Sequence, residues 1–91
     1  MTKDEAERLS ILLLQLVAKQ DQSAAFVRDK DTKENWDKYR LAVGKAMGEI
    51  CLELEGPLWK RFPELKPEPL GGPYIIDPAI YEPKFYSSEP A

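Results

Sequence analysis

Residues 27–36 read Val-Arg-Asp-Lys-Asp-Thr-Lys-Glu-Asn-Trp, and long apolar stripes run away from this polar stretch in both directions. The Asp-Lys-Asp segment at 29–31 is predicted to form a tight turn. Either Asp31, paired with Glu34, or Thr32 is predicted to cap the helix that follows. Two helices joined by so short a turn lie antiparallel, so the sequence predicts a helical hairpin.

Upstream of this turn, the chain is predicted to be helical from about residue 3 to residue 29. Thr2 and Glu5 have the spacing of a capping box, in which each side chain accepts a hydrogen bond from the other residue's backbone N–H. The stripe expected to face the core repeats at steps of three and four residues and consists of Ala6, Leu9, Leu13, Leu16, Val17, Gln20, Ala24 and Val27. Such spacing places these residues on one side of an α-helix.

Downstream of the turn, a second helix is predicted from about residue 32 to residue 55. Its stripe consists of Trp36, Tyr39, Val43, Ala46, Met47, Ile50 and Leu54. We expect this helix to stop at Glu55, because Gly56 suits a left-handed terminal conformation and Pro57 blocks a continuing helix. The predicted fold class is therefore all-α, with residues 1–56 as an antiparallel two-helix hairpin.

Residues 57–91 form a C-terminal extension that contains all eight prolines of the chain. Prolines at this density exclude a long helix. The extension is also rich in aromatic and branched aliphatic residues, unlike a disordered linker. We therefore expect it to pack on the hairpin, as part of the same domain, or on another molecule. Since a two-helix hairpin buries little apolar surface alone, we also expect a homodimer that forms a four-helix bundle.

The composition argues against several classes of function. Thirteen Lys and Arg against 16 Asp and Glu give a net charge of −3, without the basic excess of a nucleic-acid-binding protein. The chain has no His and one Cys, so it lacks the commonest general base and the commonest metal ligand. The longest apolar run, at 11–14, is too short for a signal peptide or a membrane span. We therefore expect a cytoplasmic protein that binds neither nucleic acid nor membrane.

No arrangement of residues in the sequence predicts catalysis. Glu49 and Glu53 lie one helical turn apart, but together with Glu55 and Asp37 they are expected on a solvated helix face. Cys51 has apolar neighbours and no His to activate it, so we expect a small buried hydrophobe, with a redox-sensitive thiol or an intermolecular disulfide as the alternative. The sequence predicts no catalytic residue, no cofactor, no metal and no small-molecule substrate.

Gly44 and Gly48 are separated by one turn of the second predicted helix. Each glycine inside a helix costs about 1 kcal/mol relative to alanine, which suggests a packing reason for it. We predict close helix packing at Gly44 and Gly48. The neighbour is either the first helix or the extension, or else another chain.

The stretch 57–63, Pro-Leu-Trp-Lys-Arg-Phe-Pro, is the most distinctive part of the sequence. Its aromatic residues either close the open end of the hairpin core or, with the basic residues between them, form a patch for a protein partner. The candidate partner-binding residues, taken from this stretch and from the rest of the extension, are Trp59, Arg61, Phe62, Tyr74, Ile76, Tyr81 and Phe85.

Together these observations predict a small non-enzymatic protein-interaction module with an unidentified protein partner. It would be an adaptor, a regulatory subunit, or an inhibitor or immunity-type protein of a bacterium or phage. The alternative is a structural protein of oligomerisation or assembly, whose extension straps subunits together. A net charge of −3 is too small to indicate whether the partner surface is basic.

Overall fold

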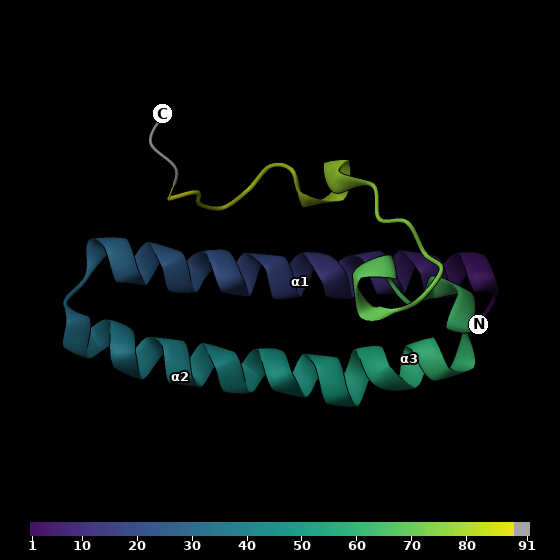
Figure 1. Cartoon of the computed structure of the whole chain (residues 1–91), viewed down its shortest axis with the longest axis horizontal. Coiled ribbons are helices and arrows are strands. Elements are labelled where there is room, and N and C mark those ends of the chain that lie inside the picture. Colours follow the sequence, from purple (N-terminus) through teal and green to yellow (C-terminus); the bar gives the residue numbers. More distant parts are fainter. Residues whose placement is uncertain (89–91) are drawn as a thin grey trace.

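The computed structural model describes residues 1–88, and every regular element in this part of the chain is helical. Helix α1 spans Lys3–Lys30 and α2 spans Lys33–Glu49, and the two lie side by side in opposite directions (Figure 1). The predicted all-α hairpin is therefore confirmed. The remaining elements are the π-helical turn η1 (Ile50–Glu55), the short helix α3 (Gly56–Arg61) and the 3₁₀ turns η2 (Pro63–Leu65), η3 (Glu68–Leu70) and η4 (Pro78–Tyr81).

Helix α1 begins and ends close to its predicted bounds. The Glu5 N–H donates to Thr2 Oγ1 (3.1 Å) and the Thr2 N–H donates to Glu5 Oε1 (2.7 Å), so the predicted capping box is present. The helix ends at Lys30, one residue beyond the prediction. Although α1 has 28 residues, neither it nor any other helix within residues 1–88 is long and apolar enough to cross a membrane.

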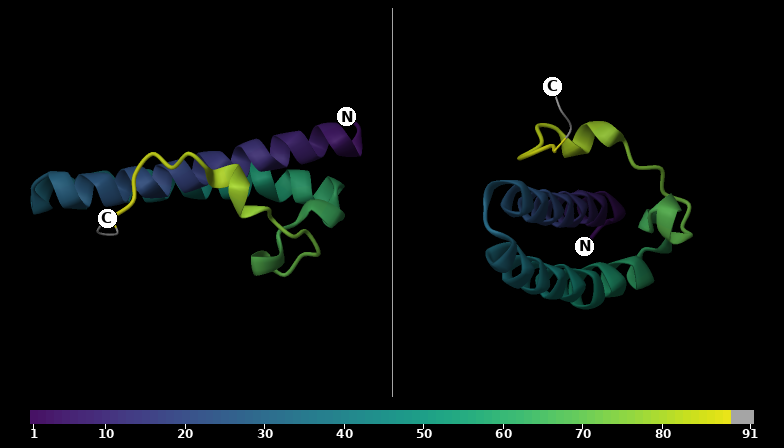
Figure 2. Two further views of the ribbon diagram at one scale, coloured as in Figure 1. Left: turned by 90° about the horizontal axis from the view of Figure 1, so that it is seen from above. Right: turned by 60° about the vertical axis from the view of Figure 1, so that its left-hand side comes forward.

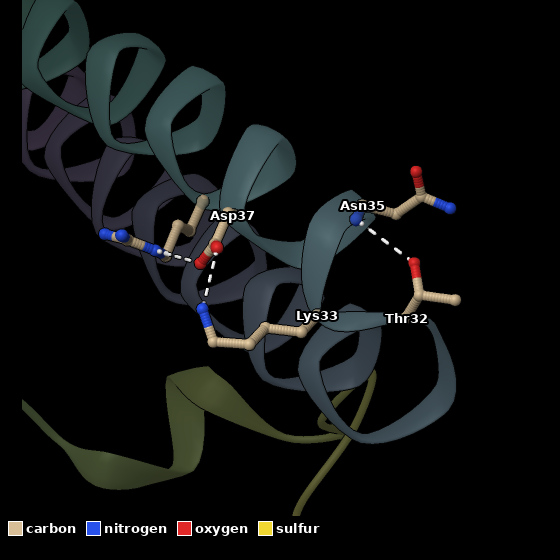
Figure 3. A network of polar contacts seen from close by, with 5 residues as sticks. Thr32, Lys33, Asn35 and Asp37 are labelled. Atoms are coloured by element: carbon tan, nitrogen blue, oxygen red, sulfur yellow. Dashed lines mark hydrogen bonds and ion pairs between the residues drawn. The ribbon is translucent and has the colours of Figure 1, made fainter.

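The connection between α1 and α2 is held by local polar contacts. Thr32, rather than Asp31, is the N-cap of α2, and its Oγ1 accepts from the Asn35 N–H at 3.2 Å (Figure 3). Asp31 has a supporting role, because its Oδ1 accepts from Asn35 Nδ2 at 3.0 Å. One turn further on, Lys33 Nζ lies 2.9 Å from Asp37 Oδ2. The turn is therefore stabilised by residues that are near one another in sequence.

The second helix was predicted to end at Glu55, and this is wrong. The chain passes without a break from α2 through η1 into α3, so the helical backbone continues past Glu55. Gly56 keeps a right-handed helical backbone (φ −55°, ψ −53°), and its N–H donates to the carbonyl of Cys51, five residues earlier. In a regular α-helix the ring of Pro57 would clash with the carbonyl four residues earlier. The wider π-helical turn accommodates the proline, so the chain continues into α3. Because a π turn holds an additional residue, it also changes which side chains face α1 beyond it.

The hydrophobic core lies at the open end of the hairpin. Its buried residues are Ala6, Leu13, Leu58, Trp59 and Leu65, which come from α1, α3 and η2. Trp59 Nε1 donates to Ser10 Oγ at 2.9 Å in this interior, which satisfies the only polar atom of the indole ring. No residue of α2 is buried. The core therefore depends on α3 and η2 returning to α1 rather than on the α1–α2 interface.

The extension packs along α1, so one of its two predicted locations is confirmed. Helix α1 lies between α2 and the extension, which runs parallel to α1 (Figure 2). The hydrogen bonds, in chain order, join Glu7 to Tyr74 (2.7 Å), Gln15 to the Ile80 carbonyl (2.9 Å), Lys19 to the Pro83 carbonyl (3.0 Å), Gln22 to the Phe85 N–H (2.6 Å) and Asp29 to Tyr86 (2.7 Å). Side chains of α1 thus pair with backbone groups of the extension at Ile80, Pro83 and Phe85, while the turns before them are closed by the extension's own backbone hydrogen bonds. Residues 89–91 of the predicted extension lie outside the described part.

Candidate partner-binding groove

A groove of about 510 Å³ runs along the flank of α1, between the extension and the second helical run, which consists of α2, η1 and α3. This volume lies within the range of roughly 300–1,000 Å³ that is usual for ligand-binding pockets. The lining is mostly apolar, and it consists of Leu14, Val17, Ala18, Asp21 and Gln22 from α1, Met47, Cys51, Glu55 and Trp59 from the second helical run, and Leu70, Tyr81 and Lys84 from the extension. Three segments distant in sequence therefore meet at one surface.

Glu55 is the unusual residue of this groove. It is the last residue of η1 and only 3% exposed. Within residues 1–88, no Lys or Arg side chain forms an ion pair with it. Burial raises the pKa of the Glu55 carboxyl above its ordinary value, and a hydrogen bond with the Cys51 thiol offsets part of this rise. The groove thus holds a buried carboxyl without a cationic partner.

Sequence reasoning missed the burial of Glu55, which was predicted to lie on a solvated helix face with Glu49 and Glu53. Those two residues are exposed, as predicted, but Glu55 is buried. The difference arises at the π turn, which ends at Glu55 and alters the helix face there. The only sequence feature that pointed to this place is the Gly-Pro pair at 56–57, which does predict a local change of the backbone.

The prediction that Cys51 is a buried hydrophobe is wrong, because the residue is exposed. It lies in η1 and lines the open groove, so its apolar sequence neighbours do not enclose it. Desolvation raises the pKa of the thiol, and the hydrogen bond to Glu55 raises it further. Cys51 is therefore protonated at neutral pH and is a poor nucleophile.

The candidate partner-binding residues of the 57–63 stretch are divided between the core and the surface. Trp59 is a core residue, 8% exposed, that also lines the groove. Phe62 is half-buried and packs against the core. Arg61 is exposed, and its guanidinium carbon lies 5.5 Å from the centre of the Phe62 ring. Arg61 also lines a second pocket of about 230 Å³, which is separate from the groove.

The candidates from the rest of the extension are similarly dispersed. The Tyr74 hydroxyl donates to Glu7, and this bond, together with burial, raises the pKa of Tyr74 to about 12. Tyr81 is half-buried and lines the groove. Ile76 is half-buried, whereas Phe85 is 56% exposed. Of all the predicted partner residues, the groove brings together only Trp59 and Tyr81.

The close packing predicted for Gly44 and Gly48 does not occur within the described chain. A Cβ atom added at either glycine would meet no atom within 4 Å. Neither α1 nor residues 57–88 of the extension places an atom within 4 Å of these two Cβ positions. Packing against another chain was the other alternative, and it stays a prediction.

Two further findings bear on function. Within residues 1–88, no group of three or more His, Cys, Asp or Glu residues is arranged to hold a metal ion. No protein-family model, no curated protein and no solved structure matches the chain. The functional interpretation therefore depends on the geometry and chemistry of the groove.

Proposed function

We propose that this chain is a non-enzymatic protein-interaction module, of the adaptor, regulatory or inhibitor type, and that a segment of its partner occupies the groove. The observation that carries this proposal is an apolar groove whose three walls are held together by contacts within the chain. Helix α1 and η1 form two walls, and the extension forms the third through its hydrogen bonds to Gln15 and Lys19. A preformed groove binds a partner at a lower entropic cost than one that orders only on binding.

The chemistry of the groove favours binding over catalysis. A nucleophilic cysteine needs a lowered pKa, whereas the pKa of Cys51 is raised. Asp21 and Lys84, which also line the groove, are exposed and make no ion pair with each other within the described chain. The mostly apolar lining is typical of the core of a protein–protein interface.

Blocking the groove tests the proposal. Ala18 is half-buried in the groove, whereas Ala42 is exposed on α2 and does not line it. Ala18→Trp should therefore fill the groove, and Ala42→Trp is the matched control. Peptides are selected on the full-length wild type from a random phage-displayed library, and their affinities for all three proteins are measured by fluorescence anisotropy. We expect binding to Ala18→Trp to be weaker by at least about tenfold, which corresponds to 1.4 kcal/mol, and binding to Ala42→Trp to be unchanged.

The proposal is contradicted if no peptide is selected or if the selected peptides bind Ala18→Trp as well as the wild type. Circular dichroism establishes that both variants keep the helical content of the wild type. Should Ala18→Trp fail to fold, Met47→Trp blocks the same groove from α2, where Met47 is also half-buried.

A second candidate function, structural assembly of several copies, is favoured by exposed leucines on α1. Leu12 is 48% exposed and Leu16 is 42% exposed, and the two lie one turn apart. A second copy of the chain that covers them would produce the predicted homodimeric four-helix bundle. Sedimentation velocity of the wild type distinguishes the two functions, since a stable dimer supports assembly and a monomer at every concentration contradicts it.

A further inference from the structure

The carboxyl of Glu55 constrains what can occupy the groove. In the chain alone, this group is 3% exposed and has the Cys51 thiol as its hydrogen-bonding neighbour. An ionised carboxylate in a dry environment is costly unless a cation pairs with it. A partner segment that fills the groove excludes the water that remains there. The partner therefore has to match this carboxyl chemically.

The surroundings of Glu55 suit a cation that is carried on an apolar stem. Trp59 and Tyr81 share the groove with Glu55, and aromatic rings attract cations. Burial raises the pKa of the Tyr81 phenol, and the nearby charge of Glu55 raises it further. Leu14 and Met47 provide apolar surface against which the methylene groups of a lysine or arginine can pack.

The other charged residues of the groove do not alter this preference. Asp21 and Lys84 are exposed and carry opposite charges, so Glu55 is the charged group of the buried part. An acidic partner side chain would be repelled by Glu55. A wholly apolar one would enclose the carboxyl without a hydrogen-bonding partner.

We propose that the partner segment inserts one lysine or arginine side chain, flanked by apolar residues, into the groove, where the cation pairs with Glu55. This inference rests on the proposed function, because it specifies the chemistry of the segment that occupies the same groove. The occupant is a protein segment rather than a free amine because one basic side chain fills only part of about 510 Å³. Apolar neighbours in the same segment fill the rest.

The peptide selection is extended to test the charge pair. Peptides selected on the wild type are sequenced, and each is measured against the wild type, Glu55→Gln and Glu53→Gln. Glu53 is the matched control, since it lies in the same π turn but is exposed and does not line the groove. In each peptide the basic residue is also replaced by norleucine, which keeps an apolar side chain and removes the charge. Hexylammonium chloride is titrated in parallel, as a probe for a free amine.

We expect the selected peptides to share a lysine or arginine between apolar residues. Binding should weaken by at least about tenfold in Glu55→Gln and remain unchanged in Glu53→Gln. The norleucine peptide should lose a similar factor against the wild type and little further against Glu55→Gln, which is the signature of a direct pair. The norleucine replacement tests the charge even if Glu55→Gln does not fold.

Other outcomes overturn the inference in distinguishable ways. Peptides that lose affinity for Ala18→Trp but lack a basic residue, or that bind Glu55→Gln normally, disprove the charge pair and leave the proposed function intact. Failure to select any groove-dependent peptide disproves both. If hexylammonium binds in a Glu55-dependent manner while no peptide does, the groove takes a small amine instead of a protein segment.

Discussion

At the turn end of the hairpin, α1 and α2 are joined by exposed contacts between residues close in sequence, whereas at the open end α3 and η2 bury large side chains against α1. The turn end has the Thr32 cap and the ion pair between Lys33 and Asp37. The open end has Trp59 and Leu65, which are far in sequence from the α1 residues that they contact. The two ends of one hairpin thus have different kinds of stabilising interaction.

This difference sets the expected size of mutational effects. An exposed ion pair contributes from about 0 to 1 kcal/mol, because water screens the charges and the side chains lose entropy. Truncation of a buried aromatic side chain costs about 3–5 kcal/mol, because it removes burial and leaves a cavity. A chain of 91 residues has a small total stability, so the open end should decide whether the hairpin folds.

The largest effect is expected at Trp59. Trp59→Ala should lower the free energy of unfolding by about 3–5 kcal/mol, since the indole is 8% exposed within the core. Urea unfolding followed by circular dichroism measures this loss. Trp59→Phe is the control, because it keeps an aromatic ring but removes the hydrogen bond to Ser10, and a smaller loss is expected. A loss for Trp59→Ala below about 1 kcal/mol would contradict the assignment of the core to the open end.

A smaller effect, with a pH dependence, is expected at Glu55. The pKa of this carboxyl is raised in the folded chain, so the folded state binds more protons than the unfolded state. Stability from this group is present below the ordinary value of 4.5 and is lost as the pH rises through the raised pKa. Glu55→Gln should remove this decline and raise the free energy of unfolding at pH 7, because the amide carries no charge that has to be desolvated. Urea unfolding at a series of pH values measures both changes.

The neighbours of Glu55 do not obscure this experiment. The pKa values of Cys51 and Tyr81 are both raised, from 9.0 and 10.0 respectively, so neither group ionises between pH 4 and pH 8. Exposed carboxyls with lowered pKa values, such as Asp31, act in the opposite direction and lose their contribution as the pH falls below their ordinary value of 3.8. Glu53→Gln should keep the decline seen in the wild type. An identical pH profile for Glu55→Gln and the wild type would show that Glu55 is not buried in solution.

The smallest effect is expected at the turn. Thr32→Ala should lower the free energy of unfolding by about 0.5–1 kcal/mol, because it removes the acceptor for the Asn35 N–H at the start of α2. Thr32→Ser is the control and should be close to the wild type, since serine retains the hydroxyl. The same urea titrations provide the values. A loss as large as that of Trp59→Ala would remove the difference between the two ends.

The candidate groove lies where the local rules of helix formation stop applying. Apolar spacing and the capping residues predicted α1, α2 and the turn between them, because these depend on residues within a few positions of one another. Pro57 was expected to end the helix, and the π turn instead carries the chain past it. That turn holds both Cys51 and Glu55, the two residues of this region whose exposure was predicted wrongly.

The contribution of the extension could be predicted only in part. Its aromatic content indicated that it packs on something, and the structure shows that it follows α1 through side-chain hydrogen bonds such as that of Gln15 to Ile80. No local pattern determines which flank of α1 it follows. Tyr81 lines the same groove as Glu55 and Met47 because the extension follows this flank of α1.

The sequence by itself determined α1 with its capping box, the start of α2 and the antiparallel arrangement of the two helices, because spacing and chain connectivity act over short distances. The tertiary structure decided that Trp59 enters the core, that Glu55 is buried, and that Gly44 has no close neighbour in the described chain. These outcomes depend on contacts between segments that are far apart in sequence. The burial of a residue is set by those tertiary contacts and not by the residue type alone.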